Sequence, residues 1–159
     1  MKITVSVPCI LFSVIFYNPA FSQNSESGIK PYFSAVVVKN AEESSRWYQS
    51  VLGVKFRNLN ENVIRGSKII VLSSENVLLE LIEVKSQVLR EDVLIDKPEQ
   101  TLIAGFTKIG FRVSDLDITM QKLKDLNVNF FGEIYTDPIS SKRSFLVHDP
   151  DKNLIQFFE

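Results

Sequence analysis

The chain has 159 residues, of which 45% are hydrophobic, a composition that suits one globular domain or two small repeated modules. Its 18 basic side chains against 19 acidic ones give a formal net charge of −1. There is no basic excess to neutralise phosphates, so nucleic acid is not an expected partner.

Residues 1–22 have the plan of a secretory signal peptide. A lysine precedes the uncharged run Ile3–Tyr17, and the small residues Ala20 and Ser22 stand before a cleavage point at Gln23. The run is short for a membrane span, so we expect a protein exported to the periplasm or secreted, with no stable membrane anchor after cleavage. The alternative is an uncleaved anchor.

The only cysteine, Cys9, lies inside this segment. The mature chain would then have no thiol, which excludes disulfides, cysteine nucleophiles and thiolate metal sites. Residues 23–30 are polar and are expected to form a disordered leader before the folded domain, residues 31–159.

The first half predicts a strand, a helix and three more strands. Asn40 can cap a helix over Ala41–Leu52, Glu43 can complete a capping box, and Gly53 can take the left-handed conformation that ends a helix. The expected strands are Tyr32–Val38, Val54–Leu59, Val63–Ser73 and Val77–Val84, with turns at residues 60–62 and 74–76.

A polar connector of about eighteen residues, Lys85–Leu102, separates the halves. It contains Pro98 and mixed charges, and we expect at most one helical turn in it. A connector of this length is a candidate lid for a binding site.

The second half repeats the order of the first. A strand over Thr107–Val113 precedes a helix that Ser114 or Asp115 caps, and Asn127 stands where Gly53 ends the first helix. The remaining strands are expected at Val128–Ile134, Ser144–His148 and Asn153–Phe158. The sequence therefore predicts an α+β fold of two βαβββ modules, about residues 31–85 and 105–159, which form a curved mixed sheet around a central cavity.

Four motifs follow one another along the chain, namely VVVKNAEESSRWYQSVLGVKF, LLELIE, KIGFRVSDLD and FLVHDPDKNLIQFFE. In this order they resemble the glyoxalase / bleomycin-resistance / extradiol-dioxygenase family, the vicinal oxygen chelate (VOC) superfamily. The last is similar to the family's DPDGN turn with its closing strand. The resemblance implies the βαβββ fold but no single activity, because this superfamily includes lyases, isomerases, dioxygenases and metal-free binding proteins.

The resemblance also implies four positions that hold a divalent metal in the family's enzymes. These positions are occupied here by Phe33, Glu80, Lys108 and Gln156. Phenylalanine has no donor atom, and lysine must lose a proton before it can coordinate. A catalytic metal is therefore disfavoured, and no cofactor is expected.

Strand alternation places the same residues on one face of the predicted sheet, where they would line the cavity. We expect a largely apolar cavity whose ligand-binding residues are Phe33, Glu80, Lys108, Arg112 and Gln156. The sharpest hypothesis places the Lys108 ammonium at the metal position, paired with the Glu80 carboxylate, because a buried carboxylate needs a compensating cation.

This arrangement favours binding of a small, partly apolar, anionic molecule without metal. The alternatives are a lyase or isomerase with Glu80 as a metal-free general base, a metal-dependent enzyme of the same superfamily, and a packed or protein-binding module. The sequence leaves open whether the protein forms a homodimer and whether its modules pair within one chain or between chains.

Overall fold

We describe the fold from a computed structural model, which describes residues 31–62, 66–98, 101 and 103–159. The predicted signal peptide, its cleavage point and the leader lie outside these residues. No helix among the described residues is long and apolar enough to cross a membrane.

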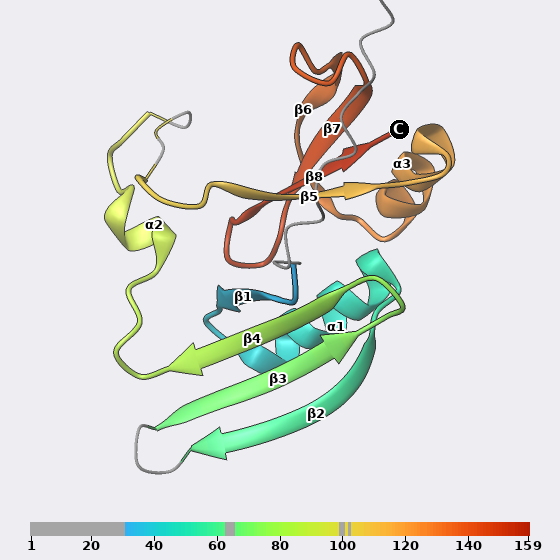
Figure 1. The fold of residues 1–159 in the computed structure, drawn as a ribbon. Helices are drawn as coiled ribbons and strands as arrows, with labels where there is room; N and C mark the ends of the chain where they lie inside the picture. The colour runs from blue at the N-terminus through green and yellow to red at the C-terminus, as the bar shows by residue number, and fades with distance from the viewer. Residues whose placement is uncertain (1–30, 63–65, 99–100, 102) are drawn as a thin grey trace, which may run out of the picture. The chain divides into compact units, whose positions relative to one another are not determined.

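The strands and helices follow the predicted order (Figure 1). The first module contains β1 (Ser34–Val37), α1 (Ala41–Leu52), β2 (Lys55–Asn62), β3 (Ser67–Ser73) and β4 (Leu78–Val84). The connector contains the short helix α2 (Arg90–Val93), the single helical turn expected there. The second module contains β5 (Lys108–Arg112), α3 (Leu116–Asp125), β6 (Asn129–Thr136), β7 (Arg143–His148) and β8 (Leu154–Phe158).

Local side-chain chemistry sets the ends of both long helices. The side chain of Asn40 accepts a hydrogen bond from the Glu43 N–H at 2.9 Å, which confirms the predicted cap of α1. Asp115 caps α3 by accepting from the Ile118 N–H at 2.8 Å. The left-handed residue that follows each helix is the predicted one, with φ of 69° at Gly53 and 54° at Asn127.

One predicted turn is wrong. Residues 60–62 continue β2 instead of ending it, and Glu61 pairs across the ladder with Lys68. The two side chains form an ion pair of 3.7 Å, and cross-strand pairing of this kind extends a strand through residues with a turn-like composition.

The sheets repeat the same topology. The first has the strand order β1-β4-β3-β2 and the second β5-β8-β7-β6, each with one parallel pair and two antiparallel pairs. The predicted fold of two βαβββ modules is confirmed. Among the described residues, hydrogen bonds join strands within each module and do not merge the two sheets into one.

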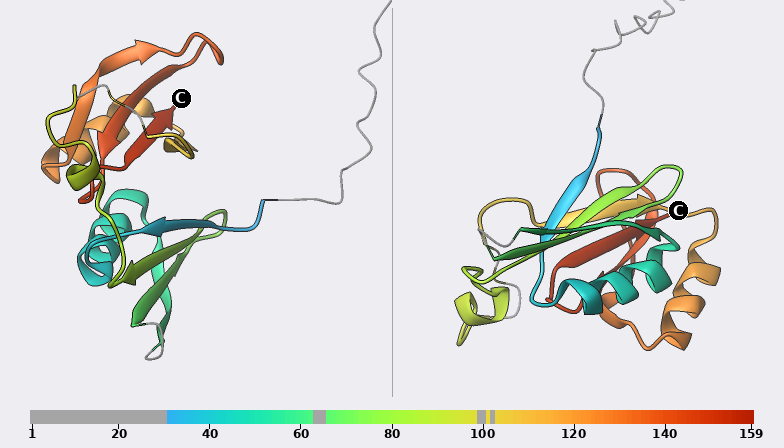
Figure 2. Two further views of the ribbon diagram at one scale, coloured as in Figure 1. Left: turned by 90° about the vertical axis from the view of Figure 1, so that its left-hand side faces the viewer. Right: turned by 90° about the horizontal axis from the view of Figure 1, so that it is seen from below.

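Each long helix covers one face of its own sheet, and we call the face without a long helix the open face (Figures 1 and 2). The buried side chains form a single apolar cluster with members from both modules, including Tyr48 and Leu81 of the first and Leu123 and Phe145 of the second. Because one core serves both modules, the chain folds as one domain from Tyr32 to Glu159.

The two modules also share a hydrogen-bonded junction. The Tyr48 hydroxyl, on α1, donates to Oδ2 of Asp149 at 2.8 Å, and the Lys39 N–H donates to Oδ1 of Asp151 at 3.1 Å. Asp149 and Asp151 belong to the turn between β7 and β8, so this turn fixes the second module against the first helix.

Candidate functional site

The strand registers place the predicted site residues on the open faces of the two sheets. On the first sheet, Glu80 lies between Ala35 of β1 and Val71 of β3. On the second, Gln156 lies between Gly110 of β5 and Leu146 of β7. Their sequence neighbours on β4 and β8 (Leu79, Leu81, Ile155 and Phe157) are buried in the core on the opposite faces.

A hollow with a volume of about 910 Å³ lies along β1 and the start of β5. Both strands are edges of their sheets. The connector closes one side of this hollow, which we call the edge pocket. Its lining includes Phe33, Val37, Tyr48, Val88, Arg90, Val93, Ile103, Phe106, Lys108, Asp151 and Leu154.

The edge pocket brings together only part of the predicted site. Phe33 and Lys108 line it, whereas Glu80, Arg112 and Gln156 do not. The predicted residues therefore divide between the pocket, the middle of the first sheet at Glu80, and the middle and far end of the second sheet.

Lys108 is not paired with Glu80, which corrects the hypothesis of a compensating ion pair. Among the described residues no salt bridge joins the two, and Glu80 is half-buried without a hydrogen-bond partner. The Lys108 charge instead contributes to lowering the pKa of Asp137, which is due first to hydrogen bonds from the Ser140 N–H and hydroxyl. Since Glu80 and Lys108 are on different sheets, strand alternation could set their faces but not their separation.

Gln156 is fully buried although it lies on the open face. Its Nε2 donates to the Tyr135 hydroxyl at 2.7 Å and to Oγ of Ser144 at 3.1 Å. Among the described residues, its Oε1 has no hydrogen-bond partner. A Cβ added at Gly110 would lie 3.1 Å from the ring of Phe158, so that ring lies close over Gly110. Side chains thus fill the space around this family position.

The residues at the family metal positions do not fit a divalent ion. Gln156 offers one buried oxygen, but its hydrogen-bonded neighbours are hydroxyl groups, and Phe33 and Lys108 supply no ready donor. Glu80 lies on the first sheet, whereas Lys108 and Gln156 lie on the second. The described part of the chain contains no group of three or more His, Cys, Asp or Glu side chains that could hold a metal ion.

The carboxylate of the edge pocket, that of Asp151, already accepts hydrogen bonds that stabilise the fold. Asp151 accepts from the Lys39 N–H and from the Ser44 hydroxyl at 3.3 Å. Burial and the nearby carboxylates of Asp149 and Glu43 raise its pKa. Lys108 and Arg90, by contrast, have no hydrogen bond or ion pair from their charged groups among the described residues. The pocket therefore has an apolar lining with two available cations.

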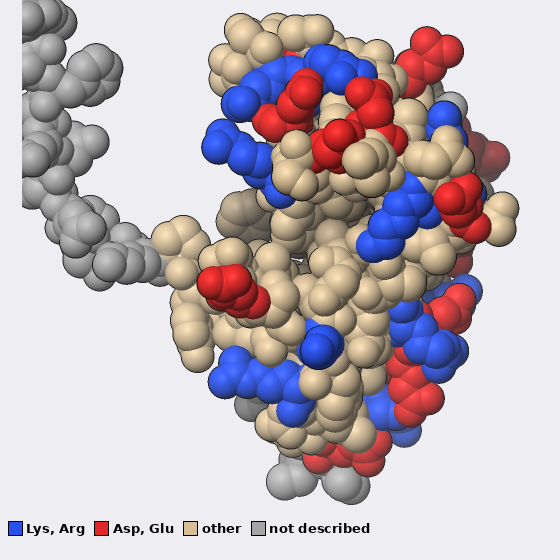
Figure 3. All heavy atoms as spheres, turned by 90° about the vertical axis from the view of Figure 1, so that its right-hand side faces the viewer, with Lys and Arg blue, Asp and Glu red and all other residues tan. Residues whose placement is uncertain are grey.

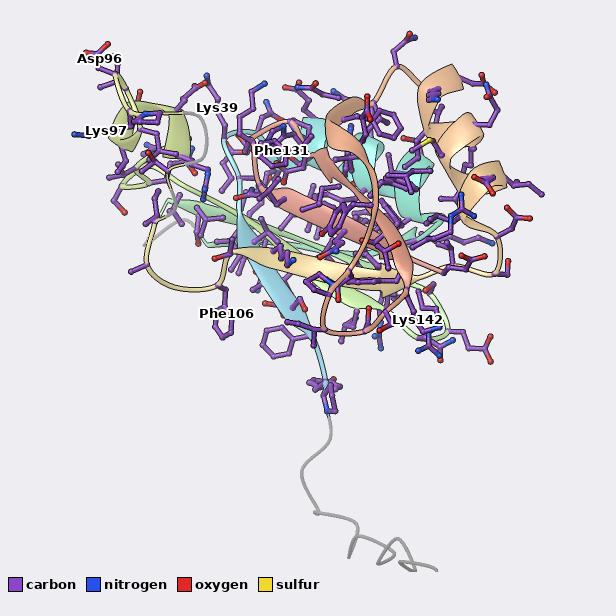
Figure 4. All side chains as sticks on the ribbon, turned by 90° about the horizontal axis from the view of Figure 1, so that it is seen from above. Lys39, Asp96, Lys97, Phe106, Phe131 and Lys142 are labelled. Carbon is purple, nitrogen blue, oxygen red and sulfur yellow. The ribbon has the colours of Figure 1, made fainter. Side chains whose placement is uncertain are left out.

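Several residues that line the edge pocket lie in the connector. The sequence suggested a role for the connector only through its length. Val88, Arg90 and Val93 line the edge pocket. Phe106 also borders it and projects outward from the segment before β5 (Figure 4). No residue pattern in the connector singles these positions out.

The loop between β6 and β7 does not form the rim of the edge pocket. Lys142, in this loop, lies far to the side from the connector residues Asp96 and Lys97 (Figure 4). Arg143, at the start of β7, forms a bidentate pair with Asp117 at 2.7 and 3.0 Å. Basic and acidic side chains are interspersed on the face in Figure 3.

Comparison with known proteins agrees with this architecture. The sequence model described as the Glyoxalase/Bleomycin resistance protein/Dioxygenase superfamily matches residues 31–157. No curated protein matches the chain.

Solved structures share the fold at low sequence identity. A glyoxalase family protein from Enterococcus faecalis has 16% identity and a TM-score of 0.70, covering 82% of this chain and 97% of its own. A fosfomycin resistance protein from Listeria monocytogenes has 14% identity and a TM-score of 0.61, covering 81% and 91%. A glyoxalase I variant from Zea mays has 14% identity and a TM-score of 0.62, covering 81% of this chain and 46% of its own.

Proposed function

Because the chain belongs to the Glyoxalase/Bleomycin resistance protein/Dioxygenase superfamily, we propose that it uses this fold to bind a small, partly apolar, anionic molecule in the edge pocket without a metal ion. Pockets for small ligands are mostly apolar, with a few polar groups that fix the orientation of the ligand. The edge pocket has this composition.

The observation that supports the proposal is the position of Lys108. Its ammonium has no ion-pair partner in the described part of the chain, and Lys108 lines the pocket together with the apolar residues Phe33, Val37 and Leu154. A carboxylate or phosphate at Lys108 would gain a charge-assisted hydrogen bond, while these side chains pack against the apolar part of the ligand.

Thermal shift with 4-phenylbutyrate, compared with the uncharged 4-phenylbutanol, tests this function. We expect the acid to raise the melting temperature saturably and more than the alcohol does. Lys108→Met keeps the length of the side chain and removes its charge, so it should reduce the affinity for the acid about tenfold. Lys142→Met, in the β6–β7 loop, is the matched control and should bind like the wild type.

Two results would count against binding in the edge pocket. One is the absence of any saturable shift with 4-phenylbutyrate and with a wider panel of aryl and alkyl carboxylates. The other is a shift that Lys108→Met leaves unchanged, since the anion would then bind elsewhere.

The enzyme alternatives, a lyase or isomerase with or without metal, rest on Glu80. No observation favours them here, because Glu80 lies between Ala35 and Val71 and does not line the edge pocket. Metal-free catalysis would require the ligand to reach the middle of the first sheet. Glu80→Gln should therefore leave the binding of 4-phenylbutyrate unchanged.

Export and dimerisation are further proposals. The signal-peptide pattern in residues 1–22 supports export to the periplasm or the medium, and the mass of the protein from producing cells should then correspond to a chain that begins at Gln23. Half-buried apolar residues on the open face of the first sheet, such as Val71, Leu78 and Ile82, support a homodimer, which light scattering would detect.

A further inference from the structure

A second hollow, with a volume of about 470 Å³, adjoins the edge pocket. We call it the turn pocket, because the turn between β7 and β8 forms one side of it. The connector supplies Arg90, Glu91 and Leu94, and the second sheet supplies Asn129, Phe130, Phe131, His148 and Leu154. Lys152 lines it from the turn.

Among the described residues, two cationic side chains of the turn pocket lack an ion-pair partner, whereas its carboxylate has one. Arg90 and Lys152 have no hydrogen bond or ion pair from their charged groups in the described part of the chain. The carboxylate of Glu91 lies 3.3 Å from the Lys39 ammonium, which offsets its charge. The pocket therefore presents two available cations, and its one carboxylate already has a partner.

The backbone at Lys152 gives an independent reason to assign it a role. Its φ is 66°, in the left-handed region that side chains with a Cβ adopt only at a cost. Glycine would adopt this conformation freely, so a lysine at this position goes against the local backbone preference. Strain of this kind at a residue that lines a pocket is a reason to look for a function.

The turn that carries Lys152 is held firmly. The Lys152 N–H donates to the Asp149 carbonyl at 3.1 Å. The Asp149 side chain accepts from the Asp151 N–H at 2.9 Å and from the Asn153 N–H at 2.8 Å. The backbone from which the Lys152 side chain projects is therefore fixed, so a ligand would not have to order it.

The geometry points to a second ligand site in the turn pocket, for a small organic anion of the phosphate-monoester class. Arg90 and Lys152 would receive the doubly charged head group, because guanidinium and ammonium groups both bind phosphate oxygens through charge-assisted hydrogen bonds. Phe131, Leu154 and Leu94 supply an apolar surface for the organic group.

This site is distinct from the proposed carboxylate site. Lys108 lines only the edge pocket and Lys152 only the turn pocket, whereas Arg90 and Leu154 line both. Substitutions at Lys108 and Lys152 can therefore separate the two proposals.

Titration calorimetry of the purified protein with phenyl phosphate tests the turn pocket, with inorganic phosphate as the head-group probe. We expect saturable binding of phenyl phosphate, weaker binding of inorganic phosphate, and an affinity for both that falls with added salt. Lys152→Gly should weaken the binding of phenyl phosphate about tenfold and should melt at the same or a higher temperature, because it removes the ammonium and the backbone strain together.

Ser141→Gly is the matched control, because Ser141 also has a positive φ, 56°, and does not line the turn pocket. It should melt like Lys152→Gly and bind phenyl phosphate like the wild type. Arg90→Gln is the second variant and should also weaken binding.

Each of the following outcomes would overturn the second site. Phenyl phosphate does not bind saturably, or it binds equally well to wild type and Lys152→Gly. Binding that Lys108→Met abolishes and Lys152→Gly preserves would place the phosphate in the edge pocket. A Lys152→Gly protein that melts at a lower temperature and binds normally would assign Lys152 to the fold alone.

Discussion

At the residue scale, the pKa values of two aspartates in the second module are shifted in opposite directions. Burial, followed by the carboxylates of Asp149 and Glu43, raises the pKa of Asp151 above its ordinary value of 3.8. Hydrogen bonds from Ser140 and Ile139, together with the Lys108 charge, lower the pKa of Asp137 from the same value.

These shifts predict stability profiles of opposite sign for two matched variants. The folded state binds the Asp151 proton more tightly than the unfolded state does, so this carboxylate costs stability as the pH rises above 3.8. The charged form of Asp137 stabilises the fold above 3.8, and that contribution is lost as the pH falls through its lowered pKa.

Urea unfolding of Asp151→Asn and Asp137→Asn, measured between pH of about 2.5 and 6.5, checks this prediction. Relative to the wild type, Asp151→Asn should gain unfolding free energy as the pH rises, and Asp137→Asn should lose it. Slopes of the same sign for the two variants would contradict the assigned environments.

At the scale of elements, the end of α1 depends on one left-handed residue. Gly53 has φ of 69°, and a Cβ added there would meet nothing within 4 Å, so the cost of a side chain is conformational only. Gly53→Ala should reduce the free energy of unfolding by about 1 kcal/mol. Gly53→Asn should cost less, because Asn127 takes the same conformation after α3. Equal losses in the two variants would contradict this explanation.

The same elements explain how much could be predicted from the sequence. Helix α1 and the left-handed Gly53 and Asn127 follow from local signals, since capping and backbone preference act over a few residues. The open faces follow from alternation along each strand. The separation of Glu80 and Lys108 depends on how two sheets pack, which no local pattern encodes. The turn at residues 60–62 was mispredicted because a cross-strand partner outweighed composition.

At the scale of the whole domain, a buried hydrogen bond joins the modules. Tyr48 is fully buried, and burial together with the adjacent Asp149 carboxylate raises the pKa of its hydroxyl, which therefore stays protonated and donates. Asn153 also donates its side-chain amide to the same carboxylate oxygen, at 2.9 Å. The joint thus combines an apolar ring in the shared core with a charged acceptor in the turn.

Removing this hydroxyl should loosen the joint. Tyr48→Phe should lower the free energy of unfolding by about 2 kcal/mol, because a buried hydrogen bond to a charged group is lost. Tyr32→Phe, at an exposed position, is the matched control and should change nothing measurable. Guanidinium unfolding, followed by the fluorescence of Trp47, would report the change. The rings of Trp47 and Tyr48 pack edge to face, with 4.9 Å between their centroids. A Tyr48→Phe protein as stable as the wild type would contradict the role of the joint.

We propose that this member of the superfamily binds an anionic ligand with the Lys108 side chain and without a metal ion. The most direct measurement is the dissociation constant of 4-phenylbutyrate for the purified protein before and after dialysis against a chelator, with elemental analysis of both samples. We expect equal dissociation constants and no stoichiometric metal in either sample. A tightly held metal whose removal abolishes binding would contradict the claim and would favour the metal-dependent enzyme instead.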